Sequence, residues 1–449
     1  MGLGSKNKKS IRHYMIVLWL GLLLAAGCQA SLSQLLPFAS STPTPENTLT
    51  PTITPQKTPN TAADTITTIP ESSIITLTLW IPEKFTSPDE AFSQQVASFE
   101  ADHADIVVEL FPKRMSGQAS TVNFLKSTQP VAPSVLPDIV ILSTDELPMA
   151  WRGKLIQPLD GLVDRTIVQD LLPIAQQLVT IDENMVAVSF EFGLEHAVYN
   201  TGKVFTTPVT WASVVSQTTN YQFPADGQNG LLNDSLLIQY LSTGAVLVSD
   251  EGKPVIDEPA LRNLLTYYQT LVTGDITDPR IVDSAYAKKL WDDYLAGLIN
   301  ITHVSSYRYL SDRRLLASTA VSPIPAQAGN TTTIGRGWAF ALVTSDPIRQ
   351  NAALKFIESF MQTEENAAWA VHSAAIPTRQ SAFNQVAGDD PYWQFLRSYL
   401  ETAQPPPSFA GYDQLSRILF VAIKQVISGE ATPDEAIDTA IQALEQTTS

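Results

Sequence analysis

Ile75-Thr76-Leu77-Thr78-Leu79-Trp80 opens the globular part of the chain. Its apolar and polar side chains alternate, which predicts a β-strand with one face against a core. Residues 87–90 (Ser-Pro-Asp-Glu) indicate a helix start, because they combine a capping residue, a proline at the first position and acids in the first turn. Phe92, Val96 and Phe99 follow at spacings of four and three, which predicts a helix with one apolar face.

The same succession of strand and helix continues downstream. The pattern predicts a second strand at residues 105–111, a helix at 118–128 and a short strand, buried on both faces, at 138–142. Strands that alternate with helices indicate an α/β fold with a largely parallel sheet. Because ligands in such sheets lie beyond the carboxyl ends of the strands, the loops after Trp80 and Leu142 are the first candidates for a site.

The globular pattern runs from residue 74 to the end of the chain, about 375 residues. This length is too great for a typical single core and favours two lobes. Residues 205–300 are mostly helical in pattern, and we expect the β-branched run at 299–304 to return the chain to the first sheet. A further strand is predicted at 334–344, and the C-terminal part is helical, with a capping box at 432–435.

The N-terminal residues are typical of an export signal. Four basic residues and no acidic one precede an apolar run at 15–26, which is short for a membrane span of roughly 20 residues. The run ends in Leu24-Ala25-Ala26-Gly27-Cys28, which resembles a bacterial lipobox, with Ala25 where leucine is usual. We therefore predict a signal peptide at 1–27 and a lipid on Cys28. An uncleaved anchor and a plain secretory signal are the alternatives.

Composition narrows the classes of function. Cys28 is the only cysteine, which excludes a disulfide framework and a cysteine-based metal site. Removal of residues 1–27 leaves 24 Lys and Arg against 45 Asp and Glu, a net charge of −21, which repels nucleic acid and anionic lipid. Residues 40–70 contain 11 Thr and 6 Pro, so we predict a disordered, partly extended tether at 28–72.

The order of these elements resembles the extracellular solute-binding proteins of ATP-binding-cassette importers, in their carbohydrate-type group. The segments that carry the resemblance are residues 75–80, Phe99-Glu100 with Ile106-Val107-Val108, Leu136-Pro137-Asp138-Ile139-Val140, residues 153–160, Val198-Tyr199-Asn200, residues 353–357, residues 362–366 and Ile376-Pro377-Thr378-Arg379. Two segments depart from the family pattern near the expected cleft, Val188-Ser189-Phe190 and residues 296–300. These departures bear on the ligand class more than on the fold.

The resemblance implies an α/β, two-lobe fold like that of periplasmic binding proteins, with each lobe a mostly parallel sheet flanked by helices and a ligand cleft between the lobes. We expect an N-terminal lobe from 73–188 and 301–345, and a helix-rich C-terminal lobe from 189–300 and 346–449. The protein is then a monomer without catalytic residues, cofactor or metal. It is exported and anchored by lipid to the outer face of the cytoplasmic membrane. It binds a sugar or oligosaccharide and delivers this ligand to a membrane permease.

Candidate ligand-binding residues stand at the predicted strand ends. A sugar needs aromatic faces for stacking and polar groups to pair with its hydroxyls, because an unpaired group in a closed cleft costs roughly 1–3 kcal/mol. The candidates are Trp80, Glu83, Ser143, Thr144, Asp145, Glu146, Glu191, Phe192, Glu195, Ser305, Ser306, Tyr307, Arg336 and Trp338.

Each candidate also has a structural interpretation. Trp80 alternates with core positions, and Asp145 and Glu146 suit a helix N-terminus. Glu191 and Glu195 can simply face water. Arg336 can pair with a surface acid; if it faces the cleft, it suits a carboxylated or phosphorylated ligand. Trp338, beside glycines that allow close approach of a backbone, is the strongest single candidate.

Two other functions fit an exported lipoprotein. The first is a lipid-anchored glycoside hydrolase, for which Asp145 and Glu191 are the only suggested carboxylate pair. The second is a sensor that binds a ligand without transport. The sequence contains no Gly-x-Ser-x-Gly elbow, and its five histidines are scattered without a metal-binding spacing.

Overall fold

The computed structural model describes residues 74–86, 91–115 and 120–448, all of which belong to one structural unit, Pro70–Ser449. The predicted signal peptide at 1–27, the lipidation site Cys28, the tether at 28–72 and the helix start at 87–90 lie outside the described residues. None of the described helices is long and apolar enough to cross a membrane.

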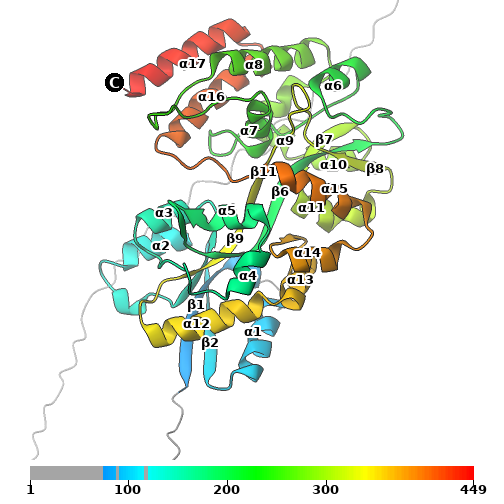
Figure 1. The fold of residues 1–449 in the computed structure, drawn as a ribbon. Coiled ribbons are helices and arrows are strands. Elements are labelled where there is room, and N and C mark those ends of the chain that lie inside the picture. Colours follow the sequence, from blue (N-terminus) through cyan, green and yellow to red (C-terminus); the bar gives the residue numbers. More distant parts are fainter. Residues whose placement is uncertain (1–73, 87–90, 116–119, 449) are drawn as a thin grey trace, which may run out of the picture. The chain divides into compact units, whose positions relative to one another are not determined.

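The first third of the unit contains the predicted alternation of strands and helices (Figure 1). It begins with β1 (Ile75–Pro82), η1 (Glu83–Thr86), α1 (Ala91–Asp102), β2 (Ile106–Lys113), α2 (Thr121–Thr128), η2 (Pro133–Val135) and β3 (Ile139–Ser143). It continues with α3 (Leu147–Arg152), α4 (Arg165–Asp170), α5 (Pro173–Val179), β4 (Thr180–Ile181), β5 (Asn184–Met185) and β6 (Val188–Asn200).

The rest of the chain is mainly helical. The middle contains α6 (Trp211–Gln217), α7 (Asp234–Leu241), α8 (Glu258–Thr273), η3 (Pro279–Val282), α9 (Ser284–Ala287), α10 (Leu290–Leu295), β7 (Ile301–Ser305), α11 (Ser306–Asp312), η4 (Arg313–Leu315), β8 (Thr319–Ser322) and β9 (Thr333–Leu342). The last part contains α12 (Pro347–Phe360), α13 (Thr363–His372), β10 (Ile376–Pro377), α14 (Gln380–Ala387), α15 (Pro391–Tyr399), η5 (Leu400–Thr402), β11 (Ala403–Gln404), α16 (Tyr412–Ile427) and α17 (Pro433–Thr448).

The central sheet has the strand order β10-β6-β9-β3-β1-β2. We expected mostly parallel sheets, but only β1 pairs in parallel with β2 and β3 along this order. The β9 strand runs antiparallel to both β3 and β6. The pairing is mixed because β6 and β9 are long strands that run in opposite directions, and β9 closes onto β3 of the first lobe.

β6 is the element that joins the two lobes. Its first half, Val188 to Leu194, pairs with β9, whereas its second half pairs with β7 and β8. Nearly every residue of this 13-residue strand is buried, as expected for a strand covered on both faces. The Gly193 position has no room for a side chain, because a Cβ there would lie 2.3 Å from the ring of Tyr307.

The lobes are built from different segments than the sequence suggested. We expected 301–345 in the N-terminal lobe, yet β7 and β8 pair with the far half of β6. The β-branched run at 299–304 therefore does not return to β1 and β3, and the sequence could not reveal this because any buried strand has the same composition.

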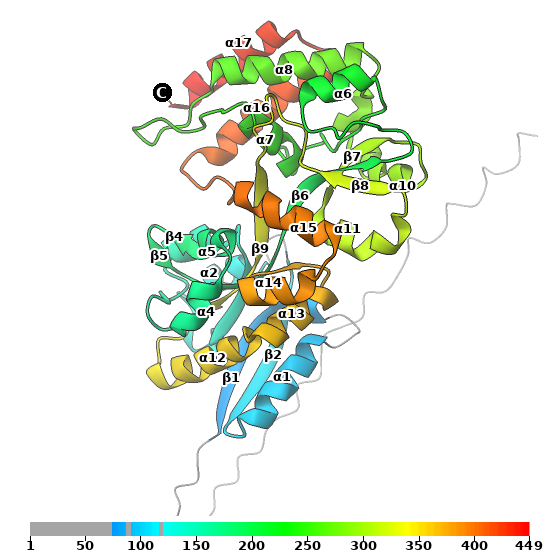
Figure 2. The same cartoon turned by 45° about the vertical axis from the view of Figure 1, so that its right-hand side comes forward.

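The segment after residue 346 also differs from the expected C-terminal lobe. α12 packs against β1 and α1. The ring of Phe360 lies 5.3 Å from that of Phe92, and Phe356 lies 5.3 Å from Phe99. In both views α12, α13 and α14 lie with β1, β2 and α1, while α6, α8 and α17 lie in the other lobe (Figure 2).

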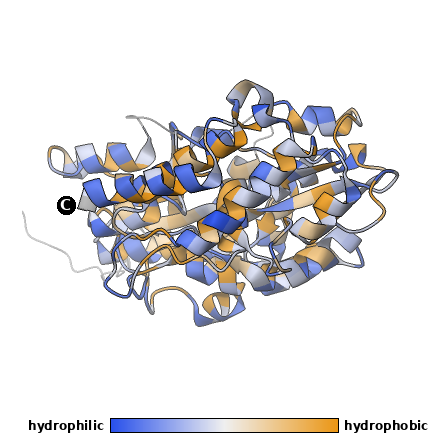
Figure 3. Cartoon of the chain, turned by 90° about the horizontal axis from the view of Figure 1, so that it is seen from above, coloured by the Kyte–Doolittle hydropathy of each residue, from blue (hydrophilic) through white to orange (hydrophobic). Residues whose placement is uncertain are grey.

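The helices of the second lobe are amphipathic, as Figure 3 shows for α17 beside the C-terminus. Ala436, Ile437 and Ala440 are buried on the face of α17 that packs against α8 and α16. This burial explains why an exposed C-terminal helix remains part of the lobe, because its apolar stripe is removed from water.

Candidate functional site

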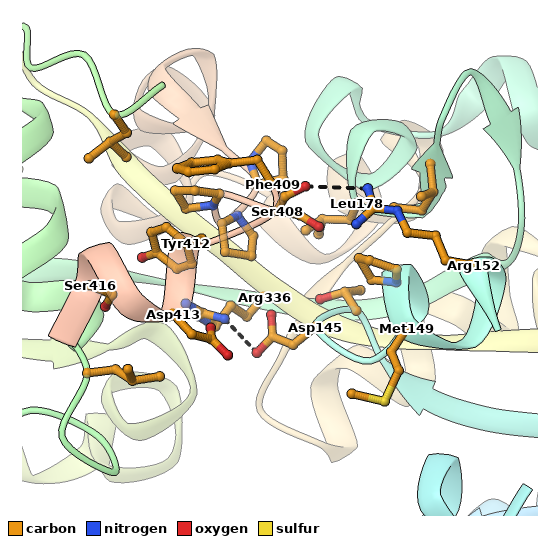
Figure 4. Close-up of a pocket in the computed structure, with 18 of the residues that line it drawn as sticks. Asp145, Met149, Arg152, Leu178, Arg336, Ser408, Phe409, Tyr412, Asp413 and Ser416 are labelled. Atoms are coloured by element: carbon orange, nitrogen blue, oxygen red, sulfur yellow. Dashed lines mark hydrogen bonds and ion pairs between the residues drawn. The ribbon is translucent and has the colours of Figure 1, made fainter. Parts of the chain in front are cut away.

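A cavity of about 1260 Å³ opens between elements of the two lobes (Figure 4). One wall comes from the end of β3, from α3 and from α5. The opposite wall comes from the loop before α7, from the segment at 404–411 and from the first turns of α16. Such a volume suits a ligand larger than most single small molecules, since typical pockets measure about 300–1,000 Å³.

Thr144 and Asp145, in the loop after β3, line the cavity on the side of the first lobe. The Thr144 backbone N–H donates to the Gly337 carbonyl at 2.9 Å, and the Gly337 N–H donates to the Thr144 hydroxyl at 3.0 Å. The loop after β3 is thus fixed to β9, and Asp145 follows directly with an exposed side chain. The expectation that a strand end would place these two residues at the cavity agrees with the geometry.

Gly337 supports the same loop by allowing two strands to approach. A Cβ at this position would lie 2.2 Å from the Glu191 carbonyl oxygen and 2.7 Å from Cβ of Phe192. The second glycine of Gly335-Arg336-Gly337 therefore allows the close approach of the β6 backbone.

Arg336 is the polar centre of the cavity. Its Nε and Nη2 donate to the two carboxylate oxygens of Asp234 at 2.7 and 2.8 Å, and its Nη1 lies 2.5 Å from Asp145 Oδ2. Burial disfavours the guanidinium charge, but the hydrogen bonds and charges of Asp234 and Asp145 raise its pKa above the ordinary value. Arg336 thus joins a residue of the first lobe to the first turn of α7 in the second.

Glu195 lies close to this ion triad. Burial raises the pKa of Glu195 to about 8, with the Asp234 charge adding to this effect and Arg336 opposing it. At neutral pH its carboxyl group is therefore mostly protonated. Glu195 is not among the described residues that line the cavity.

The second wall includes a proline-rich segment that our sequence reasoning missed. Pro405, Pro406 and Pro407 line the cavity without regular secondary structure, and each ring restricts the backbone by fixing φ. Phe409 follows, with its ring 5.6 Å from that of Tyr412 at the start of α16. Three consecutive prolines between helical segments were the signal in the sequence that could have marked this segment.

Arg152 on α3 connects the two walls at the rim. Its Nη2 lies 3.3 Å from Asp182 Oδ1 and donates to the Ser408 carbonyl at 3.4 Å (Figure 4). Both Arg152 and Asp182 have side chains about half exposed, so the pair is solvated and contributes little stability.

A second cluster of candidate residues lies away from the cavity. It contains Glu191, Tyr307 and Trp338, none of which belongs to the described residues that line the cavity. Glu191 accepts a hydrogen bond from Trp369 Nε1 at 2.8 Å and lies 3.2 Å from Lys84 Nζ. The Lys84 ammonium also lies 4.2 Å from the centre of the Trp338 ring. Lys84 was not among the residues predicted from the sequence. A lysine two residues after the first strand could have marked it as a residue of this cluster.

The electrostatics of this cluster follow from burial. The Glu191 side chain is only 1% exposed, and Lys84 is 32% exposed. Burial lowers the pKa of Lys84, whereas the charge and hydrogen bond of Glu191 act in the opposite direction. The alternative interpretation, that Glu191 simply faces water, is therefore wrong.

The remaining candidates have structural positions. Trp80 is 5% exposed and packs 5.1 Å from the Phe124 ring, so the core interpretation of this residue holds. Phe192 is fully buried, and the Ser306 hydroxyl accepts from the Leu194 N–H. The others are Glu83, exposed in η1, Ser305, which caps α11, and Ser143 with Glu146, which hydrogen-bond each other at the end of β3.

Among the described residues, no group of three or more His, Asp or Glu side chains is arranged to hold a metal ion. The two central histidines are engaged elsewhere. His196 lies 3.1 Å from the Tyr392 hydroxyl, and His303 lies 2.7 Å from that of Tyr221. Burial lowers the pKa of His196 to about 4 and that of His303 to about 3, so both rings are neutral at neutral pH.

Comparison with known proteins adds a family match. Residues 94–394, about two thirds of the chain, match the family model described as bacterial extracellular solute-binding protein. No curated protein sequence matches the chain.

Several solved structures share the fold. The cyclic α-maltosyl-1,6-maltose binding protein from Arthrobacter globiformis is similar with a TM-score of 0.70 and 17% identity, over 83% of this chain and 99% of that one. The sugar-binding protein MalE from Xanthomonas citri gives 0.70 and 18%, over 83% and 98%. The maltose/maltodextrin-binding domain MalE from Bdellovibrio bacteriovorus, bound to maltotriose, gives 0.62 and 14%, over 83% and 100%.

Proposed function

The chain belongs to the bacterial extracellular solute-binding proteins, and from this premise we propose that it captures a sugar or oligosaccharide between its lobes and delivers it to the permease of an ATP-binding-cassette importer. The observation that carries the proposal is the cavity of about 1260 Å³ whose walls come from both lobes. Its location between lobes suits a ligand that must be enclosed and later released.

The lining has the chemistry that a saccharide requires. Amide and hydroxyl groups occur throughout the cavity, among them Gln177, Gln404 and Ser408. They can pair with ligand hydroxyls, which would otherwise lose hydrogen bonds to water. Phe409 and Tyr412 supply flat apolar surfaces that can stack against the C–H faces of a sugar ring.

Closure of the lobes is the proposed mechanism of capture. A ligand that touches Asp145 on one wall and Tyr412 on the other gains its full set of contacts only when the walls approach. It therefore stabilises the closed arrangement by the difference in contact energy between the two states. The long strands β6 and β9 run between the lobes and are the natural place for such a hinge.

We propose that this capture is not catalytic. The glycoside hydrolase alternative needed Asp145 and Glu191 as a pair, yet Glu191 is buried against Lys84 and Trp369 while Asp145 lies at the cavity. Release of reducing sugar by the purified protein, at a rate abolished by Asp145→Asn, would instead support a hydrolase.

We further propose that the protein works as a monomer held at the outer face of the membrane by a lipid on Cys28. The lipobox-like sequence before this residue supports the anchor. Metabolic labelling with a palmitate analogue should mark the wild type and fail to mark Cys28→Ala. Equal labelling of both would contradict the anchor without affecting the proposal on the ligand.

A saccharide panel tests the function. The purified soluble region is titrated with neutral mono- and oligosaccharides by calorimetry, after a thermal-shift screen. Phe409→Ala should weaken binding at least tenfold through loss of a stacking surface. Phe205→Ala is the matched control, since Phe205 is 88% exposed and does not line the cavity. If no saccharide binds while another solute class does, the proposal fails.

A further inference from the structure

The two guanidinium groups of the cavity are already paired with carboxylates of the protein itself. Three of the five N–H bonds of Arg336 point to carboxylates, two to Asp234 and one to Asp145. Arg152 is paired with Asp182 at the rim. Lys126, the third cationic lining residue, is exposed on α2. An anionic ligand would therefore find no free guanidinium at the centre of the cavity.

Around Arg336, at the centre of the cavity, carboxylates outnumber cationic groups. Arg336 carries one positive charge against the two carboxylates that it contacts. Asp413 lines the same cavity from the first turn of α16, with an exposed side chain (Figure 4). Within the described part of the chain, the Asp413 side chain makes no hydrogen bond or ion pair. The centre of the cavity therefore carries a surplus of negative charge and at least one unused carboxylate.

We propose that the cavity selects uncharged or amino-bearing saccharides and rejects carboxylated or phosphorylated ones. The inference rests on the proposed capture of a saccharide and specifies its chemical class. A ligand carboxylate must either displace Asp145 from Arg336 or lie beside acids without compensation, and both cost free energy. Ligand hydroxyl and ammonium groups, in contrast, donate directly to Asp413 and to the free oxygen of Asp145.

The sequence left two interpretations of Arg336 open, an acid partner within the protein or an acidic ligand, and the structure shows two acid partners. An arginine that faces a cleft suits an acidic ligand when its fork is free to bind two oxygens. Here the fork is filled by Asp234, which begins α7, a position where the helix dipole also favours an acid. The carboxylate that binds the Arg336 guanidinium is therefore that of Asp234 and not that of a ligand. A ligand has to bind without breaking the Arg336–Asp234 ion pair.

The test compares one neutral saccharide with two of its derivatives. The probes are maltotriose, maltotriose with one primary alcohol oxidised to a carboxylate, and maltotriose with an amine in place of one hydroxyl. Calorimetry at low salt should give at least tenfold weaker binding of the carboxylate, about 1.4 kcal/mol, and binding of the amine at least equal to that of the parent. High salt should narrow the gap, because screening weakens charge repulsion.

Variants assign the effect to these residues. Asp413→Asn and Asp145→Asn should each reduce, severalfold, the difference in affinity between the neutral and the carboxylated probe. Asp438→Asn, on the exposed face of α17, changes the net charge equally and should leave the gap unchanged. Melting temperatures show that each variant is folded before its affinity is compared.

The outcomes separate the two proposals. Equal or tighter binding of the carboxylated probe by the wild type overturns the charge selection and leaves saccharide capture standing. A gap that survives unchanged in both Asp413→Asn and Asp145→Asn also overturns it, because the rejection is then steric. If none of the neutral, acidic and amino probes binds, the proposed function itself fails, and the charge selection fails with it.

Discussion

Asp138→Asn should lower the free energy of unfolding by about 3 kcal/mol. The Asp138 carboxylate is 4% exposed and joins three elements of the first lobe. It accepts from the Thr78 backbone N–H at 2.8 Å and the Thr78 hydroxyl at 3.1 Å on β1, and from Arg349 Nε and Nη2 at 2.6 and 2.5 Å on α12. An asparagine keeps the volume, but it removes the charge and turns an N–H group toward the guanidinium.

The magnitude follows from what remains after the substitution. Breaking a buried ion pair by removal of one partner costs about 3–5 kcal/mol. The Arg349 side chain is 38% exposed, so water can hydrate it in part, and the lower end of that range applies. Arg349 also keeps its hydrogen bond to the Thr76 carbonyl at 2.7 Å, which limits its rearrangement.

Urea unfolding followed by tryptophan fluorescence measures the loss. Asp102→Asn, at the exposed end of α1, serves as the control and should change the free energy of unfolding by less than about 0.5 kcal/mol. The double variant Asp138→Asn with Arg349→Met should lose less than the sum of the single changes, since the two residues share one interaction. A loss below about 1 kcal/mol for Asp138→Asn would refute the reasoning, because one ordinary hydrogen bond would explain it.

Three further predictions concern the strands at the centre. Gly337→Ala should abolish folded, soluble protein, because its Cβ would lie 2.2 Å from a backbone oxygen of β6, whereas Gly202→Ala meets only a side-chain oxygen at 3.3 Å and should be tolerated in expression tests. Lys84→Met should destabilise the protein by about 3 kcal/mol in urea by leaving the buried Glu191 unpaired, and adding Glu191→Gln should restore part of this loss. Between pH 6.5 and 8 the wild type should lose up to about 2 kcal/mol of stability relative to Glu195→Gln, as measured by urea midpoints.

The sign of the last prediction depends on which groups titrate in that window. The pKa of Glu195 rises from 4.5 to about 8 on folding, so the folded state holds a proton that the unfolded state releases, and stability falls as pH rises. His196 and His303 have lowered pKa values, so they make stability rise with pH below and around 6.5, where the unfolded imidazoles lose their protons. Glu195→Gln keeps both histidines, so the difference in stability between the wild type and this variant isolates Glu195. A difference that stays the same from pH 6.5 to 8 would contradict the burial argument.

Local sequence patterns predicted the first lobe well. Alternation identified β1, the apolar run at 138–142 identified β3, and the rule on strand ends placed Thr144 and Asp145 at the cavity. These features depend on neighbouring residues, so a short stretch of sequence contains the information. The partner of a strand does not depend on neighbouring residues in this way, which is why β7 was assigned to the wrong part of the sheet.

Burial of a strand on both faces was a second reason why the sequence could not predict the position of every candidate residue. Glu191 lies in a strand whose two faces are covered, so alternation could not show that its side chain meets Lys84 and Trp369 instead of a ligand. The segment at 405–409 presented the opposite problem. Its prolines were visible, but it reaches the cavity only because β11 pairs with β9 and directs the chain across the opening.

Arg336 shows most clearly why a residue type alone does not define a ligand. From the sequence, Arg336 could either pair with an acid of the protein or, if it faced the cleft, suit an acidic ligand, and it does line the cavity. Its partners decide between the two interpretations: Asp145 is 191 residues away in the sequence, Asp234 is 102 residues away, and the fold brings both within 2.7 Å of the guanidinium. Because these partners come from different lobes, the acids that neutralise Arg336 also join the two walls of the cavity. Charge selection and the coupling of the lobes therefore depend on the same three side chains. A change in any one of them should be assessed by the affinity for the neutral parent saccharide as well as by the discrimination against its acidic derivative.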